Sequence, residues 1–433
     1  MKMIHSFFYS VGTKLISLVI ILIARILTAR ILGPSDLGSL GNALNFTTVV
    51  SRWGSLGIAP AIQFTSSKYP DNRTTLLVYA VAVSIVVGLL NLLLLIYFNS
   101  EIIDWQFSTD SNGRFAYSKF LPCIPLVTLS MSLPIFLLGS GQIRKYSLTQ
   151  VLPLLFQTFI IASALSEKES LKTVIIAQVA NWVFTIIIAL VAIDYKSCKF
   201  KFDGDLLYSF IKYAFSAWPQ IILQFGISRF AVLIGSQYLS PKDLGYYILA
   251  SNVSESLLLI TTSVSPLIFN RIASQGTNIE LLEQTIRVTN TLMLIAMLII
   301  IFFGKSLFIF FFGVEFDQSW KLLLLLIWAV LFQGIIRICV NYIAASGKNV
   351  AVSGILLAQM TVLFVSGVIA CPKFGTAGLC YATITASIVG FIASISRLQK
   401  SDSEPGLKTF NVLLVGESDL LGIYQSLRKI RNI

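Results

Sequence analysis

Long apolar runs, separated by short polar breaks, fill most of the chain. The run over residues 76–97 shows no alternation of apolar and polar positions, so it is typical of a membrane-spanning helix and not of a barrel strand. A helix needs about 20 apolar residues to cross a bilayer. The pattern predicts an all-α polytopic membrane protein with twelve transmembrane helices, at residues 9–32, 38–64, 75–98, 119–139, 148–165, 173–193, 212–239, 245–269, 288–312, 320–345, 350–371 and 375–395.

A short motif joins the first two predicted spans of each half. The sequence LGPSDLG at residues 32–38 recurs 207 residues later as LSPKDLG at residues 239–245. Each copy alone reads as a tight turn before a helix, with Pro fixing φ, Asp capping and Gly permitting close approach. A favoured turn does not explain why both copies lie at the same place, between the first two spans of each half. This matched position favours a duplication of the half-sequence. The repeated residues are Pro34, Asp36 and Gly38 in the first copy and Pro241, Asp243 and Gly245 in the second.

Duplication after six spans returns the chain to its starting side, so the halves are predicted to be parallel repeats about an axis along the membrane normal. We expect an N-terminal six-helix bundle at residues 1–200, a C-terminal six-helix bundle at residues 201–396 and a polar cytoplasmic tail at residues 397–433. Gly54, Gly57 and Pro60 fall inside the second span, where they permit a bend; the close packing of ordinary membrane helices explains them equally well.

The composition agrees with a membrane protein. The chain is 56% hydrophobic and 12% charged, with a formal net charge of +12, whereas soluble domains carry about 25% charged residues. The basic residues are scattered among apolar helices instead of forming a solvent-facing stripe, so no nucleic-acid partner is expected. With one histidine and five cysteines at no ligand spacing, the sequence predicts no metal site, no other cofactor and no histidine-dependent triad.

The basic residues also predict an orientation. The N-terminus, the predicted loops on its side of the membrane and the tail together hold more Lys and Arg than the opposite loops do. Because basic loops are retained in the cytoplasm, both termini are predicted to be cytoplasmic.

Several charges lie inside the predicted spans. Arg25, Arg52, Arg229 and Arg337 are deep, whereas Glu255 is the one acidic residue well inside a span. A charge at a helix centre costs at least about 2.5–3.5 kcal/mol, so we expect the arginines to line a water-filled central cavity and bind an anionic, phosphate-bearing substrate. Glu255 is predicted to serve as a counter-ion or to couple transport to Na⁺ or H⁺. Lys14, Arg30 and Lys212 lie near span ends, where snorkelling explains them.

Residues 24–38, ARILTARILGPSDLG, resemble the opening signature of the polysaccharide flippases, the O-antigen transporters of the multidrug/oligosaccharidyl-lipid/polysaccharide exporter superfamily. Residues 311–316, 344–348 and 374–378 are similar to later landmarks of that family. The resemblance covers about residues 1–397. It implies a MATE-like pair of six-helix bundles around a V-shaped cavity.

The resemblance also implies a function in O-antigen, lipopolysaccharide or related polysaccharide biosynthesis. The chain would move undecaprenyl-pyrophosphate-linked oligosaccharide repeat units across the bacterial inner membrane by alternating access, with Arg25, Arg52 and Arg229 binding the substrate. Arg337 is added to the substrate-binding residues only because it lies deep in its predicted span, and not because of the resemblance. Membrane lipids, a polysaccharide polymerase and a chain-length regulator are the implied partners.

Three alternatives remain. A MATE-type ion-coupled drug antiporter should concentrate carboxylates in the membrane, which is the reverse of the charge pattern here. A peptidoglycan lipid-precursor flippase also handles an anion, but usually carries additional C-terminal helices. A membrane enzyme that polymerises or ligates lipid-linked sugars needs a large polar outer loop, and the longest one expected here spans only about residues 99–118. The prediction is therefore a transporter and not an enzyme.

Overall fold

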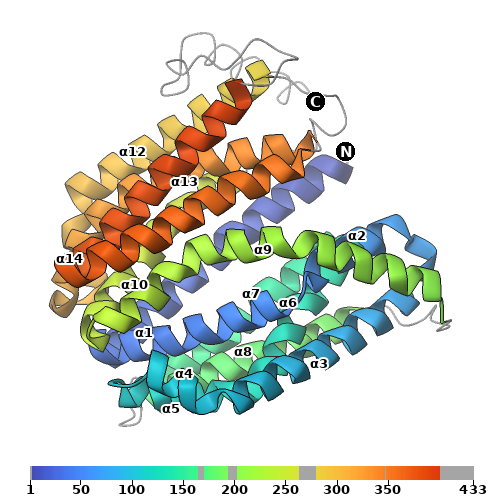
Figure 1. Ribbon diagram of the computed structural model, residues 1–433, viewed down its shortest axis with the longest axis horizontal. Helices are drawn as coiled ribbons and strands as arrows, with labels where there is room; N and C mark the ends of the chain where they lie inside the picture. Colours follow the sequence, from blue (N-terminus) through green and yellow to red (C-terminus); the bar gives the residue numbers. More distant parts are fainter. Residues whose placement is uncertain (1, 164–169, 194–201, 263–278, 347, 400–433) are drawn as a thin grey trace. The chain divides into compact units, whose positions relative to one another are not determined.

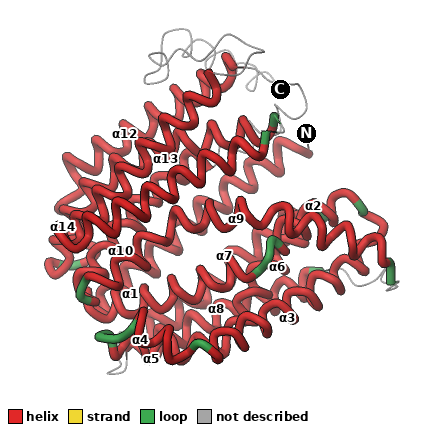
Figure 2. Tube along the Cα trace, in the orientation of Figure 1, coloured by secondary structure: helices red, strands yellow, loops and turns green. Residues whose placement is uncertain are grey.

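Helices account for every regular element that the computed structural model describes (Figures 1 and 2), namely within residues 2–163, 170–193, 202–262, 279–346 and 348–399. Most of the predicted tail at 397–433 lies outside these residues. The chain divides into a first unit, Met1–Ile248, and a second unit, Leu249–Ile433.

The helices are α1 (Lys2–Gly54), α2 (Ile58–Lys68), η1 (Pro70–Asn72), α3 (Arg73–Tyr97), α4 (Asn99–Gln106), α5 (Ser111–Phe120), η2 (Leu121–Cys123), α6 (Ile124–Gly139), α7 (Ile143–Ser163), α8 (Ser170–Ala192), α9 (Gly204–Tyr238), α10 (Pro241–Glu255), η4 (Ser256–Leu258), α12 (Ile279–Phe312), η5 (Val314–Phe316), α13 (Asp317–Ala345) and α14 (Asn349–Gln399).

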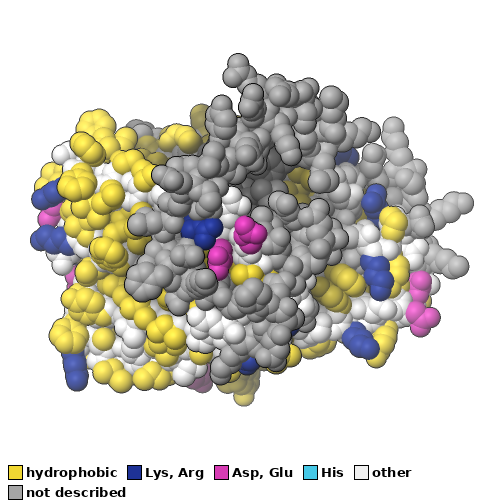
Figure 3. Space-filling model, turned by 90° about the horizontal axis from the view of Figure 1, so that it is seen from above, with side chains coloured by type: hydrophobic (Ala, Val, Ile, Leu, Met, Phe, Trp, Pro, Cys, Tyr) yellow, Lys and Arg dark blue, Asp and Glu magenta, His cyan; other side chains and the backbone are white. Residues whose placement is uncertain are grey.

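In the described residues, nine helices are long and apolar enough to cross a membrane, and hydrophobic side chains cover much of the surface visible in Figure 3. Two of these helices bend, α1 at Gly33 (φ 67°) and α14 at Gly375 (φ 58°). As a result, α14 covers two predicted spans, and α1 covers the first predicted span and part of the second. The predicted span 245–269 continues from α10 into residues outside the described part. The all-helical membrane fold is confirmed, whereas the count of twelve spans stays a prediction.

In the first unit, the limb of α1 after Gly33 packs on α5, α7 and α9, and α2 packs on α6 and α9. One core cluster, around Phe107, Tyr117 and Phe120, lies toward the Gly33 kink. A second cluster, around Ile58 and Phe210, includes the end of α8 and the start of α9. The boundary near residue 200 follows the internal repeat and remains a prediction, while α9 belongs by its packing to the first unit.

The two ends of the first unit are named here after Gly33 and Lys68. At the Gly33 end, the buried Gln106 donates through Nε2 to Asn42 Oδ1 (2.8 Å) and to Ser236 Oγ (2.5 Å), and its Oε1 accepts from Gln237 Nε2 (3.1 Å). This network joins α4 to α1 and to the end of α9.

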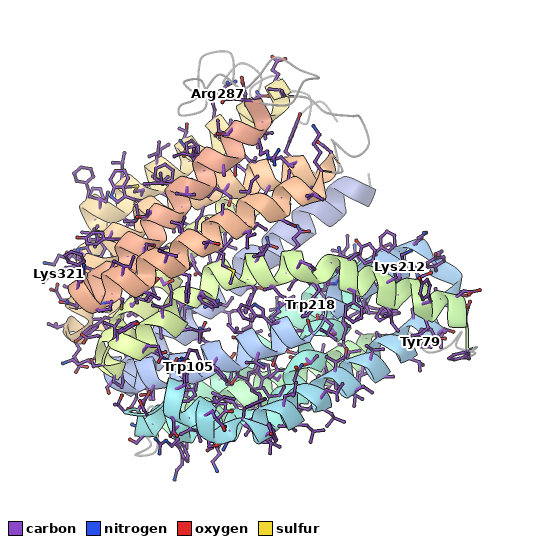
Figure 4. The ribbon with its side chains drawn as sticks, in the orientation of Figure 1. Tyr79, Trp105, Lys212, Trp218, Arg287 and Lys321 are labelled. Carbon is purple, nitrogen blue, oxygen red and sulfur yellow. The ribbon has the colours of Figure 1, made fainter. Side chains whose placement is uncertain are left out.

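At the Lys68 end, the C-termini of α2 and α6 and the beginnings of α3 and α9 come together. Ser67 Oγ donates to the carbonyl oxygen of Gly139 at 2.9 Å, and Tyr79 OH donates to the carbonyl oxygen of Asp203 at 3.0 Å. Figure 4 places Tyr79 and Lys212 at this end and Trp105 at the other.

The predicted span 38–64 is broken. The helix α1 ends at Gly54 and α2 begins at Ile58, while Leu56 (φ 51°) and Gly57 (φ 80°) adopt left-handed backbone conformations between them. A Cβ on Gly57 would meet the carbonyl oxygen of Ala214 on α9, so only glycine fits this approach. The break therefore lies directly against α9.

In the second unit, α13 packs between α12 and α14. Gln333 Nε2 donates to Ser387 Oγ at 3.4 Å, and the rings of Phe332 and Phe391 lie 5.5 Å apart, which joins α13 to α14. Gly334 of α13 lies against Met293 of α12.

Candidate functional site

The two repeated turns begin helices and touch each other within the first unit. Pro34 follows the Gly33 kink, and Pro241 is the first residue of α10. A Cβ on Gly38 would meet the carbonyl oxygen of Pro241, and a Cβ on Gly245 would meet that of Pro34. The close approach is therefore reciprocal.

The aspartates of the two turns accept hydrogen bonds from different donors. Asp36 accepts from Asn112 Nδ2 at 2.8 Å, and Asp243 accepts from Ser240 Oγ at 2.7 Å. The backbone N–H of Asp243 donates back to Ser240 Oγ at 3.2 Å, so Ser240 is the capping residue. The expectation that Asp itself caps the turn does not describe this second copy.

Arg52 lies in the last turn of α1, just before the helix break, and is partly buried. Its Cζ is 5.6 Å from the centroid of the Phe225 ring on α9, and Tyr146 of α7 lies near its guanidinium. Its Nε is buried and has no hydrogen-bond partner in the part of the chain that the structure describes. The C-terminal end of a helix favours a cation, and the buried Nε is a donor that the packing of the helices leaves unused.

Aromatic side chains hold this end of α1 against α9. The rings of Trp53 and Phe230 stack at 5.7 Å with an interplanar angle of 21°. Trp218 Nε1 donates to the carbonyl oxygen of Trp53 at 2.6 Å. Asn45 Nδ2 donates to the carbonyl oxygen of Arg229 at 3.1 Å, so Arg229 lies on the same α1–α9 contact, one turn beyond Phe225.

Further polar atoms near the break are buried without a partner among the described residues. They are Asn45 Oδ1, Ser51 Oγ, Trp53 Nε1 and Asn91 Nδ2. The Asn91 side chain, from α3, contacts Gly54 where a Cβ would otherwise lie. Buried polar groups are normally hydrogen-bonded, so this region has donor and acceptor capacity that the packing of the helices does not use.

The other predicted residues lie elsewhere. Arg25 is partly buried on the limb of α1 before the Gly33 kink. Arg337 and Glu255 belong to the second unit, where they interact electrostatically; Asn341 Nδ2 donates to the carbonyl oxygen of Arg337 at 2.8 Å and Ser251 Oγ donates to Glu255 Oε1 at 3.4 Å. The structure thus brings Arg52 and Arg229 to one helix contact and places Arg337 within electrostatic range of Glu255.

Of the residues assigned to snorkelling, Arg30 and Lys212 are exposed, and the Lys14 side chain is outside the described part. Within the described residues, no group of three or more His, Cys, Asp or Glu side chains could hold a metal ion.

Sequence reasoning missed Tyr146, Phe225 and Trp218. Tyr146 and Phe225 become neighbours of Arg52 only through helix packing, which hydropathy does not encode. A local signal existed for Trp218, because Pro219 follows it and Gly54 follows its partner Trp53. A proline inside a helix and the end of a helix both leave backbone carbonyl oxygens without helical N–H donors. An indole N–H is suited to donate to such a carbonyl oxygen.

The chain is similar to known proteins both in sequence and in fold. A family model described as "Polysaccharide biosynthesis protein" matches residues 27–321. No curated protein matches the chain by sequence. Among solved structures, the lipid II flippase MurJ in an inward closed conformation is 16% identical, with a TM-score of 0.76, over 96% of this chain and 92% of that one.

Two multidrug transporters are also similar. An inward-facing MATE family transporter of the MOP superfamily is 14% identical, with a TM-score of 0.67, over 89% of this chain and 96% of that one. A point mutant of the Vibrio cholerae MATE transporter VcmN is 15% identical, with a TM-score of 0.61, over 92% of this chain and 97% of that one. At these identities the similarity shows a shared fold.

Proposed function

Because the chain belongs to the polysaccharide biosynthesis protein family, we propose that it is a flippase for undecaprenyl-pyrophosphate-linked oligosaccharide repeat units, of O-antigen or a related surface polysaccharide. It moves them across the bacterial inner membrane by alternating access. The observation that carries the proposal is the partly buried Arg52, with its buried and unpaired Nε, at a broken membrane helix on the α1–α9 contact that also includes Arg229.

The chemistry of the head group matches this arrangement. A pyrophosphate presents several anionic oxygens, and a guanidinium donates to such oxygens through a planar fork. In the membrane an arginine is costly unless a partner or water compensates its charge, and an anionic ligand does so. Arg25 and Arg337 are assigned to substrate binding as well.

Glu255 is assigned the role of counter-ion to Arg337, on the basis of their electrostatic interaction. As a carboxylate in the membrane it is also the candidate for coupling to Na⁺ or H⁺. No organic cofactor or resident metal enters the proposal.

The distribution of charge in the first unit supports cytoplasmic termini. Among the described side chains, the Lys68 end carries Lys68, Arg73, Arg144, Lys145 and Lys212 against Asp203 and Asp205. The Gly33 end carries Arg30, Arg114, Lys119, Lys172 and Lys242 against Asp36, Glu101, Asp104, Asp110 and Asp243. Because the Lys68 end is the more basic, we place it in the cytoplasm. A polymerase and a chain-length regulator are the proposed protein partners, on the far side of the membrane.

Two other functions share the fold. The similarity to MATE transporters supports an ion-coupled drug antiporter, and the similarity to MurJ supports a flippase for a peptidoglycan lipid precursor. A buried guanidinium disfavours the cationic substrates of a drug antiporter. Between the two flippases, the family match favours the oligosaccharide substrate.

The test is translocation by the purified chain in proteoliposomes. Fluorescent undecaprenyl-pyrophosphate-linked oligosaccharide, lipid II and a cationic dye are offered in separate reactions. The proposal expects movement of the first substrate. Movement of lipid II alone, or dye exchange driven by an ion gradient without lipid movement, would overturn it.

Arg52→Gln is the variant that tests the site, and Arg397→Gln, an exposed arginine in the last turn of α14, is its control. A charge-assisted hydrogen bond is worth about 1.5–3 kcal/mol, so Arg52→Gln is expected to slow translocation about tenfold or more at equal protein level. Equal rates for Arg52→Gln and Arg397→Gln would reject the role of Arg52.

A further inference from the structure

A cationic and aromatic surface lies on the seam between α2 and α9, at the Lys68 end of the first unit. The Phe64 ring of α2 stacks on the Tyr213 ring of α9 at 4.1 Å with an interplanar angle of 1°. Lys68 Nζ lies 5.5 Å from the Phe64 ring and 5.3 Å from the Tyr69 ring. Its ammonium group is therefore held in place by aromatic faces that bridge two helices.

A second lysine lies beside this stack. Lys212 is adjacent in sequence to Tyr213, and its Nζ is 5.9 Å from the Tyr208 ring. Both lysines are exposed. In the described part of the chain, neither forms an ion pair with a carboxylate. A cation–π contact positions an ammonium group without neutralising it, so both charges remain available to an anion.

Apolar side chains continue from the lysines along α9. Tyr208 is 66% exposed and Phe215 is 51% exposed, and both lie within about one turn of Lys212 on α9. Exposed aromatic rings bind apolar groups, and ammonium groups that are not neutralised bind anions. A surface with both can bind an amphiphile with an anionic head group, such as an anionic phospholipid.

The charge of this end also suits an anionic leaflet. The Lys68 end is the basic end of the first unit, and the cytoplasmic leaflet of a membrane is the one to which basic segments are attracted. In the orientation proposed above, the lysines and the aromatic rings therefore lie on the cytoplasmic side, where anionic head groups would meet them.

We propose that the α2–α9 seam binds an anionic phospholipid, with Lys68 and Lys212 contacting its phosphate and Tyr208 and Phe215 contacting its acyl chain. The ligand is a resident membrane lipid and not the transported substrate. The site is distinct from Arg52, and the proposal stands without the flippase assignment.

The test is native mass spectrometry of the full chain, delipidated in detergent and titrated separately with phosphatidylglycerol and phosphatidylcholine. The double variant Lys68→Gln/Lys212→Gln is compared with Lys119→Gln/Lys242→Gln. This control removes two lysines at the Gly33 end, including Lys119, whose Nζ is likewise 5.4 Å from an aromatic ring, that of Phe115.

The test variant is expected to lower phosphatidylglycerol occupancy about tenfold and to leave phosphatidylcholine occupancy unchanged, because each lysine contributes to the attraction of an anionic lipid. The control should bind as the unmodified chain does, and Lys68→Arg/Lys212→Arg, which keeps both charges, should retain the lipid. Equal occupancy in the test and control variants would overturn the proposal. Displacement of the lipid by millimolar inorganic phosphate would also overturn it, because the site would then recognise phosphate alone.

Discussion

The indole Nε1 of Trp218 donates a hydrogen bond of 2.6 Å to the backbone carbonyl oxygen of Trp53. This carbonyl belongs to the last turn of α1, where the helix ends and leaves its acceptors without helical partners. A side chain of α9 thereby satisfies the end of a broken helix. The same contact fixes the backbone next to Arg52.

Trp218→Phe keeps the aromatic packing but removes this donor. We expect the substitution to lower the free energy of unfolding by about 1–2 kcal/mol, because a buried acceptor loses its partner. The measurement is thermal unfolding of the purified protein in detergent, with Trp105→Phe, a residue 55% exposed, as the control. Identical midpoints for the two variants would show that the hydrogen bond contributes nothing.

Gly57→Ala tests the break between α1 and α2. The substitution should destabilise the protein, since alanine disfavours φ 80° and its Cβ would meet the carbonyl oxygen of Ala214. Gly141→Ala is the matched control, because Gly141 also has a positive φ (75°) but open space around its Cβ position. The difference between the two unfolding midpoints isolates the contact with α9. No difference would contradict the close approach.

Gln106→Leu tests the network at the Gly33 end. It leaves the buried groups of Asn42 and Ser236 without their partner, which costs about 1–3 kcal/mol for each unsatisfied group. We expect faster hydrogen exchange in α4 and at the end of α9, measured by mass spectrometry. In Asn112→Ala, which removes an exposed hydrogen bond to Asp36, exchange in α9 should stay unchanged. Protection in α9 that survives Gln106→Leu would refute the prediction.

Arg337 and Glu255 are expected to be coupled in the second unit. The destabilisations caused by Glu255→Gln and Arg337→Gln should sum to more than that of the double variant, with a coupling energy of about 0.5–3 kcal/mol in a double-mutant cycle. The exposed pair Lys305–Asp317, at 3.8 Å, should give a coupling of at most about 1 kcal/mol in the same unfolding experiment. Additive effects of Glu255→Gln and Arg337→Gln would remove the assigned role of Glu255 as a counter-ion.

Hydropathy was sufficient to predict the helical membrane fold and the bounds of some helices, such as α3 and α13, to within a few residues. It separated the two limbs of α1 near Gly33 and of α14 near Gly375, because each kink coincides with a short polar or glycine-containing break.

The packing of α9 on α1 and α2 could not be predicted in this way. Hydropathy measures how favourable it is to transfer a segment from water to lipid. Which helices pack together within the membrane depends instead on the shapes of their surfaces and on hydrogen bonds between them. Gly57 against Ala214 and Trp218 on Trp53 are contacts of that kind. The internal repeat indicated equivalent faces of the two halves, but not which helices touch.

Gly38 approaches Pro241 and Gly245 approaches Pro34. Because this contact is reciprocal, each motif copy restricts which residues the other can accept. A mutation that adds a side chain to either glycine would push on the backbone of the other copy, so neither copy is free to diverge alone. The requirement for glycine at both positions is therefore a physical reason for the similarity of the two seven-residue sequences.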